Sequence, residues 1–128
     1  MSEEANAKKP IDIRERVFEF AVRIVKLYKY LEKNSDVSRN VILQLLDAGT
    51  SVGANLEEAK AGQSTADFIH KNAIALKEAR ESNYWLRLIL ATENFKDEAR
   101  SGIENLRDEA MVIAKIVGKI IVNTKARK

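Results

Sequence analysis

The 128-residue sequence contains no cysteine, one proline and only five glycines. The missing cysteines exclude disulfide bonds, thiolate metal ligands and a cysteine nucleophile. So little glycine and proline disfavours a turn-rich β fold and favours helices. No apolar run reaches the roughly 20 residues that a membrane span requires, and MSEEANAKKP does not have the pattern of a signal peptide. We therefore expect a helical protein of the cytoplasm.

The composition is that of one globular domain, with 45% hydrophobic and 32% charged residues. We expect this domain to span residues 1–128, with a flexible N-terminus of about 1–10 and a short basic tail of about 124–128. The net charge of +3 is unevenly distributed, because the last fourteen residues carry five cations and no carboxylate side chain. The candidate nucleic-acid contacts are Lys115, Lys119, Lys125, Arg127 and Lys128.

Hydrophobic residues three and four apart predict four helices, over about 13–33, 37–60, 65–92 and 97–123. Short loops between long helices are typical of an all-α, up-down-up-down antiparallel four-helix bundle. Two signals separate the second and third helices. Gly62 predicts a helix end, because glycine accepts the left-handed conformation, and Ser64 followed by Asp67 resembles an N-terminal capping box.

Two helical glycines, Gly49 and Gly53, lie one turn apart in GTSVGANLEEAKAG. Each costs about 1 kcal/mol relative to alanine inside a helix. Small residues allow helix backbones to approach closely, and the third helix offers Ala75 and Ala79. We therefore interpret Gly49 and Gly53 as packing glycines that face the third helix.

Three asparagines, Asn55, Asn72 and Asn83, flank the apolar stripes of the second and third helices. One interpretation is a polar cluster that binds a ligand inside the bundle. The other is a set of hydrogen bonds between helices that sets their register.

The back of the third helix carries an apolar cluster of Ile74, Tyr84, Trp85 and Leu88 beside Glu81. Exposed apolar patches with a charged rim are typical of protein–protein surfaces, and tryptophan and tyrosine are preferred anchors there. The cluster predicts a contact between copies of the chain in a homo-oligomer. In the alternative interpretation Trp85 covers the core of its own bundle.

Candidate chemistry is sparse. A di-metal bundle site needs a Glu-x-x-His from two of its helices, whereas His70, with Asp67 three residues before it, is the one histidine of the sequence. No acid–base pair, metal cage or activated nucleophile emerges. We therefore expect a protein that is not an enzyme, with no catalytic residue, no metal, no cofactor and no small-molecule substrate.

Two stretches, QLLDAGTSVGANLEEAKAG and DFIHKNAIALKEARESNYWLRLI, resemble the 23S rRNA intervening sequence proteins, also called S23 ribosomal proteins. The resemblance covers roughly residues 15–122, which is nearly the whole chain. The pattern of that bacterial family, a small residue followed by Ala-Asn-hydrophobic-x-Glu, falls on Gly53, Ala54, Asn55, Leu56 and Glu58.

The resemblance implies a four-helix bundle that forms homo-oligomers, and pentamers in comparable members. Distantly similar accessory proteins bind nucleic acid as strongly basic pentamers, whereas this chain is mildly basic. Two functional hypotheses follow. The first is a non-enzymatic, homo-oligomeric scaffold or accessory protein that associates with RNA or DNA. The alternative is a protein–protein interaction module without nucleic-acid binding.

Overall fold

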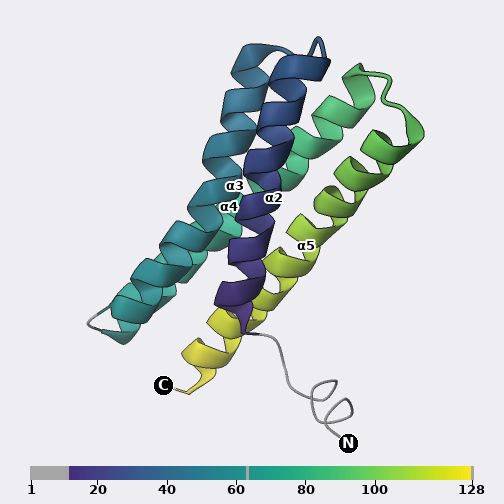
Figure 1. Ribbon diagram of the computed structural model, residues 1–128. Helices are drawn as coiled ribbons and strands as arrows, with labels where there is room; N and C mark the ends of the chain where they lie inside the picture. Colours follow the sequence, from purple (N-terminus) through teal and green to yellow (C-terminus); the bar gives the residue numbers. More distant parts are fainter. Residues whose placement is uncertain (1–11, 63, 128) are drawn as a thin grey trace, which may run out of the picture.

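A computed structural model describes residues 12–62 and 64–127 and contains four long helices in this part of the chain (Figure 1). The helices are α2 (Ile13–Asn34), α3 (Arg39–Ala61), α4 (Thr65–Thr92) and α5 (Asp97–Ala126). The predicted all-α bundle is confirmed, and the predicted bounds of α4 agree at both ends. The expected flexible segment of about 1–10 and the cation Lys128 lie outside the described residues.

The helix starts follow from local hydrogen bonds. The Asp12 carboxylate accepts a 2.8 Å bond from the Arg14 N–H at the start of α2. The Ser64 hydroxyl accepts a 3.0 Å bond from the Asp67 N–H at the start of α4, as the capping box predicts. Gly62 does end α3, but its φ of −64° is not left-handed. A Cβ on this residue would meet the end of the flexible Asp67 side chain, which could move aside, and would lie 3.2 Å from the backbone carbonyl oxygen of Ala59.

Each helix packs against the helices next to it in the order α2, α3, α4, α5, and α5 closes the bundle against α2. The α2–α5 pair is packed much less extensively than the other three pairs. In Figure 1, α2 and α5 lie close together where α2 begins and diverge toward the end where α5 begins. The bundle is therefore tightly packed along three of its sides and open along the fourth.

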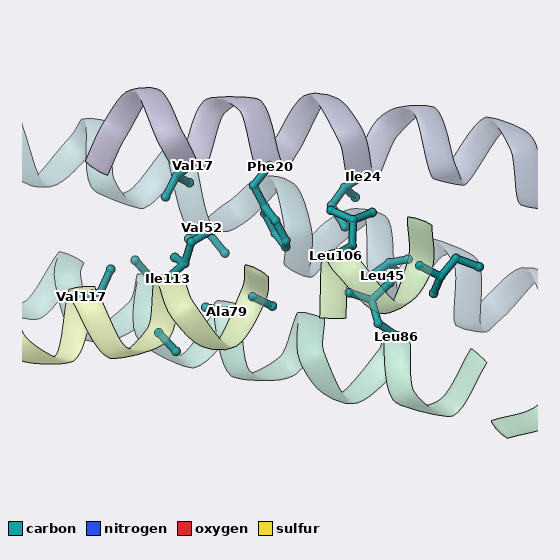
Figure 2. Close-up of a cluster of buried hydrophobic side chains, with 14 of the residues drawn as sticks. Val17, Phe20, Ile24, Leu45, Val52, Ala79, Leu86, Leu106, Ile113 and Val117 are labelled. Atoms are coloured by element: carbon teal, nitrogen blue, oxygen red, sulfur yellow. The ribbon is translucent and has the colours of Figure 1, made fainter. Parts of the chain in front are cut away.

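The core consists of aliphatic side chains from all four helices with one aromatic ring, Phe20 (Figure 2). Its largest fully buried members are Phe20, Ile24, Leu31, Leu45, Leu86, Ile89, Ile103 and Ile113. Burial of each such side chain contributes about 1.5–3 kcal/mol to the hydrophobic free energy of folding. None of the helices in the described ranges is both long and apolar enough to cross a membrane.

Candidate functional site

The two glycines of α3 pack closely against a neighbouring helix, but that helix is α2. A Cβ on Gly49 would lie 2.7 Å from Cγ2 of Ile24, and a Cβ on Gly53 would lie 3.3 Å from Cγ1 of Val17. The expectation that these glycines face the third helix is therefore wrong. Periodicity places both glycines on the inward side of α3, but it does not identify which neighbour crosses there.

The small residues of α4 are also inside the bundle. Ala75 and Ala79 are both fully buried, and Ala79 points into the cluster that Figure 2 shows. They belong to the hydrophobic core, where α4 packs against α3 and α5.

The three asparagines differ in their hydrogen bonds. Asn83 donates a 3.0 Å bond from Nδ2 to the backbone carbonyl of Arg107 on α5, and its Oδ1 accepts a bond from Nε of Arg87. Asn72 is buried, but it donates to the Phe68 carbonyl of its own helix. Asn55 likewise donates to the Ser51 carbonyl. A bond between helices is therefore present at Asn83, whereas Asn55 and Asn72 bond within α3 and α4.

The back of α4 combines an exposed ring with a half-buried one. Tyr84 is 48% exposed, and its ring meets that of Trp85 edge-on at 5.0 Å. Trp85 itself packs against the hydrophobic core, so it covers the core of its own bundle as the alternative interpretation predicts. The remaining members, Ile74 and Leu88, are half-buried. The cluster therefore presents an edge of apolar surface to solvent.

Two carboxylates interrupt this apolar surface. Glu78 and Glu81 lie between Ile74 and Trp85 along α4. Partial burial, followed by the nearby charge of Glu81, raises the pKa of Glu78 above its ordinary value, and Asp47 of α3 adds a smaller effect in the same direction. Lys77 opposes this change in the pKa. Glu78, Glu81 and Asp47 therefore lie close together on the α3–α4 side of the bundle, beside the cation Lys77.

The opposite charge gathers at the end of the bundle where α5 finishes. A hollow of about 550 Å³ lies between the α3–α4 turn and the end of α5. Lys60 and Arg127 both line it, together with the polar side chains of Ser64, Asn123 and Thr124. No carboxylate is among the described residues that line this hollow. The lining therefore suits an anion, although the Asp67 carboxylate lies beside Gly62 and Lys60 is close enough to Asp12 to lower the pKa of that carboxyl.

The other candidate cations are distributed along α5. Lys115, Lys119 and Lys125 are exposed, and none of the three forms an ion pair with another described residue. Lys115 and Lys119 lie one turn apart on the outer face of the helix. The fifth candidate, Lys128, lies outside the described residues.

Two arginines near the same end are already neutralised. Arg16 of α2 makes a bidentate pair with Glu109 of α5, with bonds of 2.6 and 2.8 Å. These bonds raise the pKa of the Arg16 guanidinium. Arg14 lies 3.2 Å from Asp12 and 3.8 Å from Glu57. Lys60 forms no ion pair among the described residues, but its charge acts on the Asp12 carboxylate. Lys71 lies at this end as well, beside Glu58 and Asp67.

The open side between α2 and α5 forms a groove that sequence reasoning does not identify. Two hollows of about 750 and 480 Å³ lie along it and share Arg23. Phe18 at its edge is 65% exposed, and Tyr30 is 40% exposed. The apolar face of the first helix, which is too broad for one seam, is the signal from which this groove could have been inferred.

No group of three or more histidine or acidic side chains with the spacing of a metal site occurs within residues 12–62 and 64–127. The single histidine, His70, is exposed on α4.

The arrangement defines the class of the protein as an antiparallel four-helix bundle with an open α2–α5 groove, an acidic apolar surface on α4 and a basic end. Residues 9–118 match the family described as 23S rRNA-intervening sequence protein. The chain belongs to that family, as the sequence resemblance predicts.

A solved structure supports the same assignment. The chain is similar to a protein with unknown function from the S23 ribosomal protein family of Bacteroides thetaiotaomicron VPI-5482. The two share 44% sequence identity with a TM-score of 0.75, over 86% of this chain and 98% of the other. No curated protein matches the sequence.

Proposed function

We propose that this protein is a non-enzymatic, homo-oligomeric bundle that acts in the cytoplasm as an accessory or scaffold protein for RNA or DNA. The observation that carries the proposal is the hollow bordered by Lys60 and Arg127. Two cations and several hydroxyl and amide groups face it, and none of its described lining residues is acidic. Such a surface suits the phosphates of a nucleic-acid backbone.

Self-association would increase the effect of this small surface. Each copy contributes few cations, so one bundle would bind phosphates weakly. An oligomer, such as the pentamer that the family resemblance implies, would present one such end per copy, and the linked contacts would add in avidity. The exposed Tyr84 and the open α2–α5 groove support self-association, because soluble monomers rarely leave large apolar surfaces uncovered.

The oligomeric state is tested by light scattering on the purified protein at micromolar concentration. A mass of several chains supports the proposal, and a monomeric mass contradicts it. Trp85→Glu is expected to dissociate the oligomer while circular dichroism remains helical. Loss of helical signal in this variant would place Trp85 in the core alone.

Nucleic-acid binding is tested by fluorescence anisotropy with a structured RNA and a duplex DNA at low salt. Lys60→Gln with Arg127→Gln is expected to weaken binding. The matched control, Lys29→Gln with Lys33→Gln, removes the same charge from exposed positions near the other end of α2 and should bind like wild type. No binding at low salt, or equal binding by both variants, would instead favour a protein–protein interaction module without nucleic acid.

A further inference from the structure

One stripe of α4 carries both apolar side chains, of the kind that anchor protein–protein contacts, and acidic side chains. Ile74, Glu78, Glu81, Trp85 and Leu88 follow one another at intervals of four, three, four and three residues, which places them on one side of the helix. None of the five is fully buried. We call this stripe the α4 ridge. It extends over about 21 Å, with acidic side chains at its centre and apolar ones at both ends.

The part of the α2–α5 groove near the start of α5 is also apolar, but its charged side chains are mostly positive. Leu27, Ile103 and Leu106 line this hollow of about 480 Å³ with apolar surface. Arg23, Lys26 and Lys96 also line it and supply three cations, against one carboxylate, that of Glu98. Lys26 and Lys96 are exposed and form no ion pair within the described part of the chain. The groove therefore combines an apolar lining with cations that no ion pair among the described residues neutralises.

A glycine of α5 adds an independent observation. Gly102 lines the same hollow, and a Cβ built on it would meet nothing within 4 Å. Glycine weakens a helix relative to alanine, and no neighbour within the described chain requires its absent side chain. Gly49 and Gly53, in contrast, are both in contact with α2. The space above Gly102 is open, as is the space above Gly118 outside the groove, so Gly102 leaves the hollow wider than an alanine would.

We propose that the α4 ridge of one copy docks into the α2–α5 groove of another. In this contact Trp85 and Leu88 meet the apolar lining, and Glu78 and Glu81 meet Lys26 and Lys96. The proposal rests on the self-association proposed above and names the two surfaces that meet. The second copy is the occupant because its ridge complements the groove in both apolar character and charge.

The positions of the two surfaces determine the type of assembly. The acidic centre of the ridge lies near Asp47 of α3, on the α3–α4 side, and the groove lies on the α2–α5 side. Every copy therefore carries one donor surface and one acceptor surface at different places. A contact of this heterologous kind generates a ring when the rotation between copies closes, rather than a two-fold dimer.

Charge reversal on each surface tests the contact. The groove variant carries Lys26→Glu and Lys96→Glu, and the ridge variant carries Glu78→Lys and Glu81→Lys. Each is expected to be monomeric by light scattering, with the dissociation constant raised at least about 30-fold by repulsion between like charges. Lys115→Glu with Lys119→Glu makes the same charge change on exposed positions of α5 outside both surfaces, and should assemble like wild type.

A mixture of the two variants gives the most specific result. The groove variant retains a ridge, and the ridge variant retains a groove, so one intact contact can form between them. Equal amounts are expected to restore assembly, because the unchanged ridge meets the unchanged groove and the lysine ridge meets the glutamate groove with the two charges exchanged. A mixture that stays monomeric would overturn the proposed pairing.

Failure of this inference is distinguishable from failure of self-association. A wild-type monomer overturns the proposed oligomer itself. A wild-type oligomer that persists in the groove variant overturns only the ridge-to-groove contact. Circular dichroism verifies that each variant is folded. If the ridge variant loses its helical signal, Glu81→Lys alone, at an exposed position, replaces it. This single variant is then used both in light scattering by itself and in the mixture with the groove variant.

Discussion

Gly49 of α3 lies directly against Ile24 of α2, so closely that a Cβ on the glycine would be 2.7 Å from Cγ2 of the isoleucine. Ile24 is fully buried and cannot move into solvent. Gly49→Ala is therefore expected to lower the free energy of unfolding by about 1–3 kcal/mol through overpacking, despite the better helix propensity of alanine. Urea denaturation of the two proteins measures the change.

The matched test of this account is a double-mutant cycle. Ile24→Ala removes the atoms that the new Cβ would meet, so Gly49→Ala should cost much less in the Ile24→Ala background. Equal costs in the two backgrounds would show that the close approach at Ile24 is not the cause.

The other glycines should respond in order of their surroundings. A Cβ on Gly53 would be 3.3 Å from Val17, whereas one on Gly118 would meet nothing within 4 Å. Gly118→Ala is expected to stabilise the protein by about 0.4–1 kcal/mol, and Gly53→Ala to change its stability less. Gly53→Leu should cost about 1–3 kcal/mol. Thermal melting ranks the three variants, and a Gly53→Leu protein that melts at or above wild type would contradict the packing role.

Asn83 joins α4 to α5 through its bond to the Arg107 carbonyl. Asn83→Asp keeps the shape of the side chain but replaces the donor with a negatively charged acceptor that faces a carbonyl oxygen. We expect a loss of about 1–3 kcal/mol in the free energy of unfolding. Asn55→Asp is the control, because Asn55 bonds within its own helix and is only half-buried. A loss at Asn55 as large as that at Asn83 would rule out a special role for the bond between helices.

The raised pKa of Glu78 predicts the direction of a pH effect. Because burial and the charge of Glu81 raise its pKa in the folded state, the folded protein holds this proton more tightly than the unfolded chain does. Stability should then fall as pH rises from the ordinary pKa of a glutamate through the raised pKa of Glu78.

Glu78→Gln removes this dependence and should raise the melting temperature at neutral pH, with a smaller gain at about pH 4, close to the ordinary pKa of a glutamate. The comparison is made in the Lys26→Glu, Lys96→Glu background so that self-association does not contribute. A gain that is equal at both pH values would contradict the assigned cause.

Salt dependence reports how many phosphates the basic residues neutralise. Changing Lys115, Lys119, Lys125, Arg127 and Lys128 together to glutamine should weaken binding to every duplex sequence alike. The slope of log affinity against log salt should become less steep by roughly 0.9 for each phosphate that the variant no longer neutralises. Anisotropy titrations at several salt concentrations measure the slope. An unchanged slope would place the phosphate-binding residues elsewhere on the protein.

The sequence predicts the helices well because their signals are local. The capping pair Ser64 and Asp67 marks the start of α4 within a few residues, and the structure has the same bond. The predicted end of α5 is less accurate, because the helix continues to Ala126 whereas the sequence predicts an end near Asn123. No glycine or proline follows Asn123 to provide a stop signal.

The relations between helices are harder to predict. Spacing places Gly49 on an inward face, but only the crossing of α3 with α2 determines that Ile24 is its neighbour. Similarly, the bond from Asn83 to Arg107 depends on the register of α4 against α5. The α2–α5 groove arises from the divergence of two helices that are far apart in the chain (Figure 1). The broad apolar face of the first helix indicates surplus apolar surface there, but it does not encode where the two helices diverge.

The open fourth side of the bundle also has a consequence for folding kinetics. Three of the four helix pairs join neighbours in sequence, so most native contacts close short loops, and such topologies fold in microseconds to milliseconds. The α2–α5 pair is the exception, and its Arg16–Glu109 bond spans 93 residues. We expect α2 and α5 to join after the other helices have paired, and a φ-value close to zero at Glu109 would be the kinetic signature of that order.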